Sequence, residues 1–174
     1  CEATPSTMAA IIALPDEKVE EICAAVNAEG EVCVPANYNC PGQIVISGSV
    51  PGIEKACELM KAAGAKRCIP LKVSGPFHGK LMEPAGEQLE QELLQAQVGE
   101  IQLPFVSNVT ADFVTDKDEI RGLLKRQISS SVRWQQTIER LIADGAEEFV
   151  EIGPGRSLSG FMRKINREVT TCNI

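Results

Sequence analysis

The order of extended and helical segments in residues 8–73 limits the possible folds more than any other feature of the sequence. Residues 8–14 are a continuous apolar run that predicts a buried strand. Apolar side chains then recur at helical spacing through residues 16–29, with acidic residues at the start, where the helix dipole favours them. Residues 32–38 and 43–47 follow as two extended segments separated by a Pro-Gly turn. The first half of this stretch therefore reads strand, helix, strand, strand.

The remainder of the stretch adds one more helix and one more strand. A helix is predicted after Pro51, and it ends at Gly64. Residues 66–73 alternate through Ile69, Leu71 and Val73, as a strand does. The complete order is β-α-β-β-α-β, which is the split βαβ pattern of ferredoxin-like domains. We predict a ferredoxin-like small subdomain over residues 7–73.

Residues 74–174 differ in having longer helices and few strands. Helical spacing is found in four segments, at 82–96, 120–128, 134–142 and 158–165. Extended segments are expected at 104–109 and 147–152, with a further one possible at 169–172. This half is α/β in type, but it has too few strands to form the covered sheet that such helices need. Because the chain opens with Cys1, we expect that it begins inside a longer protein whose N-terminal portion supplies the other strands.

Composition argues against several classes of protein. Hydrophobic residues make up 44% of the 174 positions, so the chain can bury a core. A net charge of −7 disfavours nucleic acid and anionic membranes as partners, and no apolar run is long enough to span a bilayer. We therefore expect a soluble cytoplasmic protein. The seven cysteines form no C-x-x-C pair, and with a single histidine they predict buried thiols and no metal site. They are Cys1, Cys23, Cys33, Cys40, Cys57, Cys68 and Cys172.

His78 is the only histidine and the leading catalytic candidate. No other side chain type here has an unperturbed pKa near neutrality. Gly75 and Pro76 precede it and Gly79 follows it, which predicts a loop between a strand and a helix, where functional sites often lie. The alternative is a purely structural histidine.

A histidine base requires a nucleophile, and the chain offers no obvious one. No serine occurs in a G-x-S-x-G elbow. Cys40, in a Pro-Gly turn, is the best placed thiol, so a Cys-His pair is a possible alternative. The run GPGRSLSG at residues 153–160 lies between a strand and a helix and could bind phosphate, although its spacing favours an ordinary turn.

The segment between Met60 and Met82 is locally basic. It contains five cationic residues and no acidic one, whereas the chain as a whole is acidic. Such a run is either a solvated face or a docking site for an anion or an acidic partner. The five residues are Lys61, Lys66, Arg67, Lys72 and Lys80.

Several motifs, taken together, resemble one enzyme family. They are MAAII at residues 8–12, NYNCPGQIVISG at 37–48, KAAGAKR at 61–67, GPFH at 75–78 and EIGPG at 151–155. In this order they are similar to the malonyl-CoA:acyl carrier protein transacylases of bacterial fatty-acid synthesis, and the resemblance covers nearly the whole chain. It implies that the ferredoxin-like subdomain is inserted in an α/β-hydrolase-like acyltransferase subdomain, of which residues 74–174 are the C-terminal part.

The resemblance also implies a reaction and a set of site residues. An active-site serine would take malonyl from malonyl-CoA and pass it to the phosphopantetheine thiol of acyl carrier protein, with the coenzyme A thioester as substrate and no separate cofactor. His78 would be the catalytic base, and the backbone carbonyl of Gln127 would orient it. Phe77 would select malonyl over branched acyl groups, and Asn37 and Asn39 would face the cleft.

The chain departs from the family in what it lacks. The oxyanion-loop glutamine, the GHSLG serine elbow and the arginine that binds the malonyl carboxylate are all absent, and Cys40 replaces the usual serine. We therefore expect this chain alone to be inactive. The alternatives are a polyketide-type acyltransferase with another extender unit, and a noncatalytic module that binds the carrier through its basic stretch.

Overall fold

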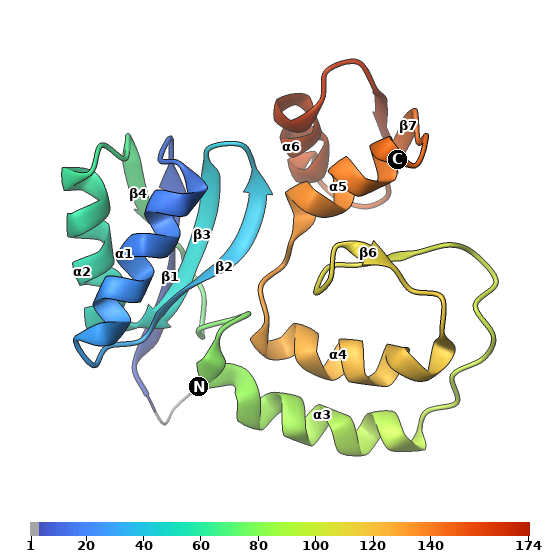
Figure 1. The fold of residues 1–174 in the computed structure, drawn as a ribbon, viewed down its shortest axis with the longest axis horizontal. Coiled ribbons are helices and arrows are strands. Elements are labelled where there is room, and N and C mark those ends of the chain that lie inside the picture. The colour runs from blue at the N-terminus through green and yellow to red at the C-terminus, as the bar shows by residue number, and fades with distance from the viewer. Residues whose placement is uncertain (1–3) are drawn as a thin grey trace.

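The first four strands form one antiparallel sheet in the computed structural model, which describes residues 4–174 and therefore leaves Cys1 outside the described residues. The strands are β1 (Ser6–Ile12), β2 (Cys33–Cys40), β3 (Gln43–Ser49) and β4 (Arg67–Pro70), in the spatial order β2-β3-β1-β4 (Figure 1). Each neighbouring pair is antiparallel. This element order and pairing confirm the predicted ferredoxin-like pattern.

Two helices pack side by side on this sheet. They are α1 (Asp16–Ala28) and α2 (Val50–Ala62). α2 begins where the Ser49 hydroxyl accepts a hydrogen bond from the Gly52 amide, with Pro51 in its first turn. Val19, Val26 and Met60 are fully buried between the helices and the sheet. This apolar core stabilises the unit formed by β1 to β4, α1 and α2, which we call the small lobe.

The strand ends differ slightly from the prediction. β1 ends at Ile12, and Ala13 has a left-handed φ of 62°. β4 covers only residues 67–70 of the predicted 66–73. β4 is an edge strand, and Pro70 has no N–H to donate, so pairing stops there apart from one hydrogen bond from Leu71 N–H to the Met8 carbonyl, at 2.9 Å.

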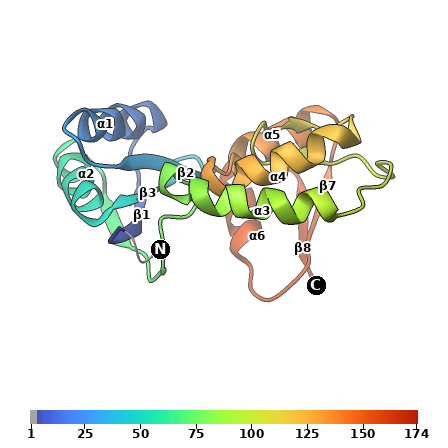
Figure 2. The ribbon, with the colours of Figure 1, turned by 90° about the horizontal axis from the view of Figure 1, so that it is seen from below.

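The second lobe is mostly helical. A 3₁₀ turn, η1 (Lys80–Met82), leads into α3 (Glu83–Gln95), and another, η2 (Lys117–Glu119), leads into α4 (Ile120–Ser129). α3 and α4 lie side by side, as Figures 1 and 2 both show. The remaining elements are α5 (Trp134–Ala143), β7 (Glu148–Glu151), α6 (Ser157–Ile165) and β8 (Thr170–Asn173).

The strands of this lobe form two separate pairs. The predicted segment 104–109 contains only β5 (Val106–Ser107), which forms a hairpin with β6 (Asp112–Phe113), a strand that the sequence analysis did not anticipate. β7 and β8 form a two-stranded parallel sheet. Parallel strands are usually covered on both faces. Here Val150 is 46% exposed, and Ile152, just after β7, is 83% exposed, so one face of this sheet remains uncovered within the described chain.

The lobes are joined by backbone pairing at β2. Val132, between α4 and α5, donates its N–H to the Ala36 carbonyl at 2.8 Å and accepts from the Tyr38 N–H at 2.9 Å. The Ser131 hydroxyl donates to the Pro35 carbonyl at 2.6 Å. These bonds fix the end of α4 against the small lobe. None of the helices within residues 4–174 has the length and apolar character needed to cross a bilayer.

Candidate active site

His78 lies in a strained turn that leads from the small lobe into η1. Its φ is +57°, a left-handed value that is uncommon for residues other than glycine. Gly79 packs closely on the small lobe, where an added Cβ would lie 3.2 Å from Val34 Cγ2 and 3.3 Å from Ser47 Oγ. The Gly79 carbonyl accepts from the Met82 N–H at 2.9 Å. Strain that is held in place by its surroundings in this way is characteristic of functional sites.

The imidazole of His78 is oriented by a residue that is distant in the sequence. Its Nδ1 lies 3.0 Å from the backbone carbonyl oxygen of Gln127, which is 49 residues away in the sequence. Gln127 is in the last turn of α4, where carbonyl oxygens have no partner within the helix. A carbonyl can only accept, so Nδ1 carries a proton, and in the neutral ring Nε2 then has a free lone pair. The arrangement suits a general base.

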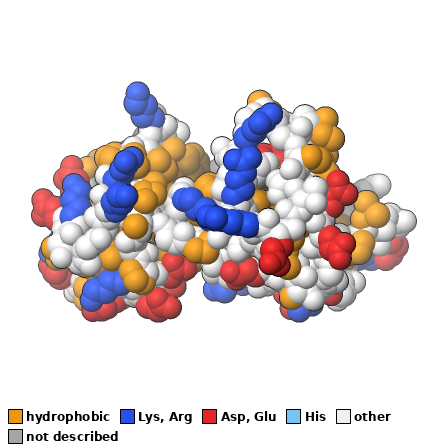
Figure 3. All heavy atoms as spheres, turned by 90° about the horizontal axis from the view of Figure 1, so that it is seen from above, with side chains coloured by type: hydrophobic (Ala, Val, Ile, Leu, Met, Phe, Trp, Pro, Cys, Tyr) orange, Lys and Arg blue, Asp and Glu red, His pale blue; other side chains and the backbone are white. Residues whose placement is uncertain are grey.

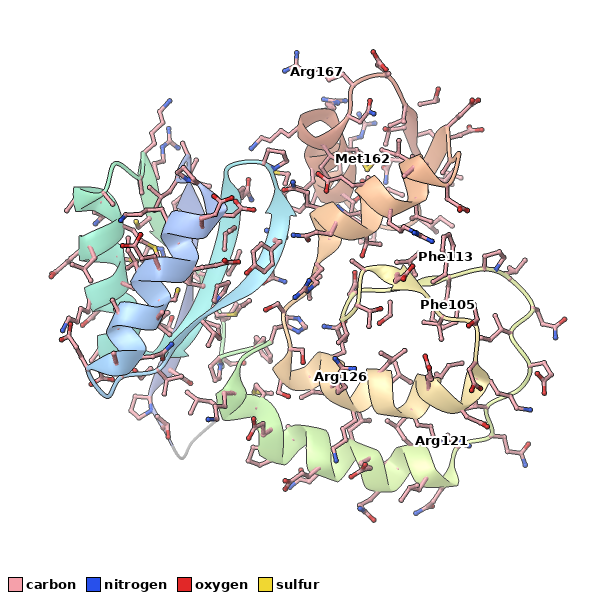
Figure 4. The ribbon with its side chains drawn as sticks, viewed as in Figure 1. Phe105, Phe113, Arg121, Arg126, Met162 and Arg167 are labelled. Carbon is pink, nitrogen blue, oxygen red and sulfur yellow. The ribbon has the colours of Figure 1, made fainter. Side chains whose placement is uncertain are left out.

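An open cavity of about 400 Å³ lies beside this histidine. Cations outnumber anions in its lining, with Lys80, Arg126 and Arg133 against Glu83. The other lining residues are Val34, Pro35, Val109, Ser129, Ser130 and Ser131. Figure 4 labels Arg126 on α4 near the junction with the small lobe. Sequence reasoning did not identify Arg126, Arg133 or Glu83, and the only signal for Arg126 was its position next to Gln127.

None of the three residues predicted to bind substrate is in the lining of this cavity. Phe77 adjoins His78 in the turn and is 37% exposed. Asn37 and Asn39 are half-buried in β2, and Asn37 forms a bridge with Val132. Within the part of the chain that the structure describes, neither asparagine lines the cavity.

The basic residues of segment 60–82 are exposed but spread out. Lys66, Arg67 and Lys72 lie at or beside the edge strand β4. Lys61 lines a different cavity, of about 540 Å³, between α2 and β4, whereas Lys80 lines the cavity of His78. Figure 3 shows Lys and Arg side chains projecting from both lobes, with one group lying across their junction.

The structure weighs against the thiol nucleophile considered above. Cys40 is buried at 1% exposure, and burial raises the pKa of its thiol. It is not among the residues that line the His78 cavity. Cys40 is therefore poorly placed and poorly activated for attack. Nor does any group of three or more His, Cys, Asp or Glu side chains within residues 4–174 form an arrangement that could hold a metal ion.

A protein carboxylate occupies the possible phosphate site in GPGRSLSG. Glu151, at the end of β7, accepts from the Leu158 and Ser159 amides at 3.1 and 2.9 Å and from the Ser159 hydroxyl at 2.6 Å. These bonds hold the pKa of the Glu151 carboxyl below its usual value. The N-terminus of α6 is thus capped from within the chain, and the run is a structural turn.

The fold and the family model agree on the class of protein: the chain belongs to the acyl transferase domain family, whose model matches residues 2–172. It is 47% identical over 173 residues to the malonyl CoA-acyl carrier protein transacylase of Bacillus subtilis (strain 168), covering 98% of this chain and 55% of that protein. The chain thus spans about half the length of the curated relatives it matches.

Solved structures of similar proteins agree with the fold. An acyl carrier protein S-malonyltransferase from Vibrio cholerae has a TM-score of 0.94 and 40% identity, covering 97% of this chain and 55% of that one. A malonyl-transacylase in complex with the holo acyl carrier protein of a type II polyketide synthase has a TM-score of 0.94 and 38% identity, covering 98% and 55%.

Proposed function

We propose that the full-length protein carrying this chain transfers malonyl from coenzyme A to the phosphopantetheine thiol of an acyl carrier protein, in fatty-acid biosynthesis. The observation that carries the proposal is the 3.0 Å contact between His78 Nδ1 and the Gln127 carbonyl, which leaves Nε2 available as a base. The names of the similar proteins support malonyl as the acyl group and a carrier protein as the acceptor. Coenzyme A enters as a thioester substrate, and the reaction needs no separate cofactor.

His78 acts twice in this proposal. Its Nε2 first takes the proton from a serine hydroxyl, supplied outside this chain, as the serine oxygen attacks the thioester carbonyl. The departing coenzyme A thiolate then takes up that proton, which leaves malonyl-serine. In the second half the carrier thiol gives its proton to Nε2 and attacks the malonyl-serine, and the serine oxygen leaves with the proton. In both halves the Gln127 carbonyl stabilises the imidazolium and keeps the ring in place.

We assign specificity to three further residues. Phe77 adjoins the base, and a bulky ring there leaves little room for an α-methyl branch, which favours malonyl over methylmalonyl. Asn37 and Asn39, on the strand that joins the lobes, bind the substrate from the small-lobe side. We also place the reaction in the cytoplasm, because the six cysteines of the described residues are free thiols, as expected in a reducing compartment.

The proposal that the nucleophilic serine lies outside this chain can be tested directly. The 174-residue chain is expected to transfer malonyl no faster than its own His78→Ala variant, because it contains no serine elbow. The measurement is the appearance of malonyl carrier protein from malonyl-CoA, with methylmalonyl-CoA assayed in parallel. Transfer by the chain alone, above the His78→Ala background, contradicts the external serine. Faster use of methylmalonyl by the full-length protein contradicts the assignment of Phe77.

We also propose that Lys61, Lys66, Arg67, Lys72 and Lys80 form the dock for the acidic carrier. The double charge reversal Lys66→Glu and Arg67→Glu should weaken carrier binding by roughly tenfold at low ionic strength, with a smaller effect at high salt. Binding is measured by titrating the carrier into the chain at two salt concentrations. The control is Lys18→Glu on α1, outside the basic segment, which changes the net charge by half as much. Equal binding by the double variant and the control removes Lys66 and Arg67 from the dock.

A further inference from the structure

Gln127 makes two hydrogen bonds, one through its backbone carbonyl and one through its side-chain amide. Its backbone carbonyl accepts from His78 Nδ1 at 3.0 Å, and its side-chain Nε2 donates to the Ser130 carbonyl at 3.2 Å. α4 ends at Ser129, and Ser130 is already extended, with φ −115° and ψ 151°. The amide of Gln127 therefore ties the first residue beyond the helix back onto the last turn.

The segment that this amide holds is also fixed to the small lobe. Ser131 and Val132 are joined to β2 by three hydrogen bonds, one from the Ser131 hydroxyl and two through the Val132 backbone. The turn of His78 rests on the same strand, because Gly79 packs against Val34. The His78 turn and the segment that follows Gln127 are thus both held against β2. The Gln127 side chain adds a hydrogen bond between the helical turn that presents the carbonyl and Ser130, the residue just before the paired segment.

This link matters because helix ends fray. The last four carbonyls of a helix have no internal partner, and without a cap they can turn toward water. If the Gln127 carbonyl turned away, Nδ1 would lose the acceptor that favours the Nδ1–H tautomer of His78. A mixture of tautomers would present Nε2 with a lone pair for only part of the time.

We propose that the side-chain amide of Gln127 is a positioning group that fixes the end of α4 and thereby selects the Nδ1–H tautomer of His78. It acts on the reaction through the histidine and does not touch substrate. The proposal rests on the proposed function only in giving the lone pair on Nε2 a task. The tautomer itself is a property of the 174-residue chain and can be measured without catalysis.

The single histidine makes the test direct. In the chain labelled with ¹⁵N-histidine, all imidazole nitrogen signals come from His78, so the NMR shifts of neutral imidazole report one tautomer equilibrium. We expect Nδ1–H to dominate in the unmodified chain. Gln127→Met keeps the side-chain length but removes the donor, and it should lower the Nδ1–H fraction at least twofold. Gln127→Lys, which restores a donor, should recover most of that loss.

Gln102→Met is the matched control. Gln102 also donates from its side chain to a backbone carbonyl, that of Glu100 at 3.3 Å, but it is exposed and does not line the cavity of His78. It should leave the tautomer unchanged. A predominance of Nε2–H in the unmodified chain overturns the proposal without any variant. So does an unchanged Nδ1–H fraction in folded Gln127→Met.

Kinetics then separate this proposal from the proposed function. In the full-length protein, Gln127→Met should lower kcat about tenfold, the effect of one lost hydrogen bond, with KM within about twofold of the original value. A tautomer shift without any malonyl transfer by the unmodified protein supports the positioning role and contradicts the proposed function. Normal kcat in Gln127→Met despite the shifted tautomer overturns the catalytic relevance of the side chain and leaves His78 as the base.

Discussion

The variant His78→Ala of the full-length protein is expected to transfer malonyl roughly 10²–10⁴ times more slowly than the unmodified protein. The reason is the loss of the proton acceptor at Nε2, which both half-reactions use. Binding of malonyl-CoA should change much less, because the imidazole acts mainly as the proton moves. The measurement is kcat and KM for malonyl transfer to the carrier protein.

The unusual backbone at His78 calls for a second variant. Alanine is strained at a φ of +57°, so part of any loss in His78→Ala could come from a displaced turn. Asparagine tolerates the left-handed region and cannot act as a base near neutral pH. His78→Asn should therefore lose as much activity as His78→Ala while keeping the unfolding temperature closer to the original. Activity within threefold of the unmodified protein in either variant would refute the role of His78 as base.

The substitution Gly48→Ala is expected to lower the free energy of unfolding of the chain by about 3 kcal/mol or more. A Cβ built at Gly48, on β3, would lie 1.8 Å from the Val32 carbonyl oxygen and 2.7 Å from its carbonyl carbon. Both of these Val32 atoms are backbone atoms, and the carbonyl oxygen accepts a hydrogen bond from the Ser49 N–H at 2.9 Å. The clash can be relieved only by separating the end of β3 from the start of β2, which would break the pairing of Gly48 with Cys33.

Gly122→Ala is the control for this prediction. Gly122 lies in α4, and nothing outside its own turn lies within 4 Å of an added Cβ. Alanine there should stabilise the chain by about 0.5–1 kcal/mol, because it lowers the backbone entropy of the unfolded state. Both variants are compared by urea unfolding monitored by circular dichroism. A Gly48→Ala chain as stable as the original would show that β2 and β3 do not approach as closely as described.

The pattern of the first 73 residues was sufficient to predict the small lobe. Strand alternation and helical spacing depend on neighbours two to four residues apart, so they can be read from the sequence without knowledge of packing. The same local signals placed His78 in a turn between a strand and a helix. The division of the chain into subdomains at residues 73 and 74 stays a prediction, although the sheet of β1 to β4 lies entirely before that boundary.

Gln127 could not be found from local pattern, because it looks like an ordinary helical glutamine. Only the family resemblance pointed to it, and only the fold brings its carbonyl within 3.0 Å of His78 across 49 residues of sequence. Arg126 and Arg133 line the same cavity through the same packing of α4 and the following segment against β2. Local periodicity cannot determine such contacts, because they depend on how two lobes meet.

The sequence by itself therefore determined the strand and helix order of the small lobe, the scarcity of strands in the second half and the single histidine on which the proposed chemistry depends. The tertiary structure alone decided the left-handed backbone of His78 and its bond to Gln127. It also decided that the N-terminus of α6 is occupied by Glu151. The reason is physical: short-range spacing sets secondary structure, whereas long-range backbone pairing, such as that between Val132 and β2, sets which side chains meet.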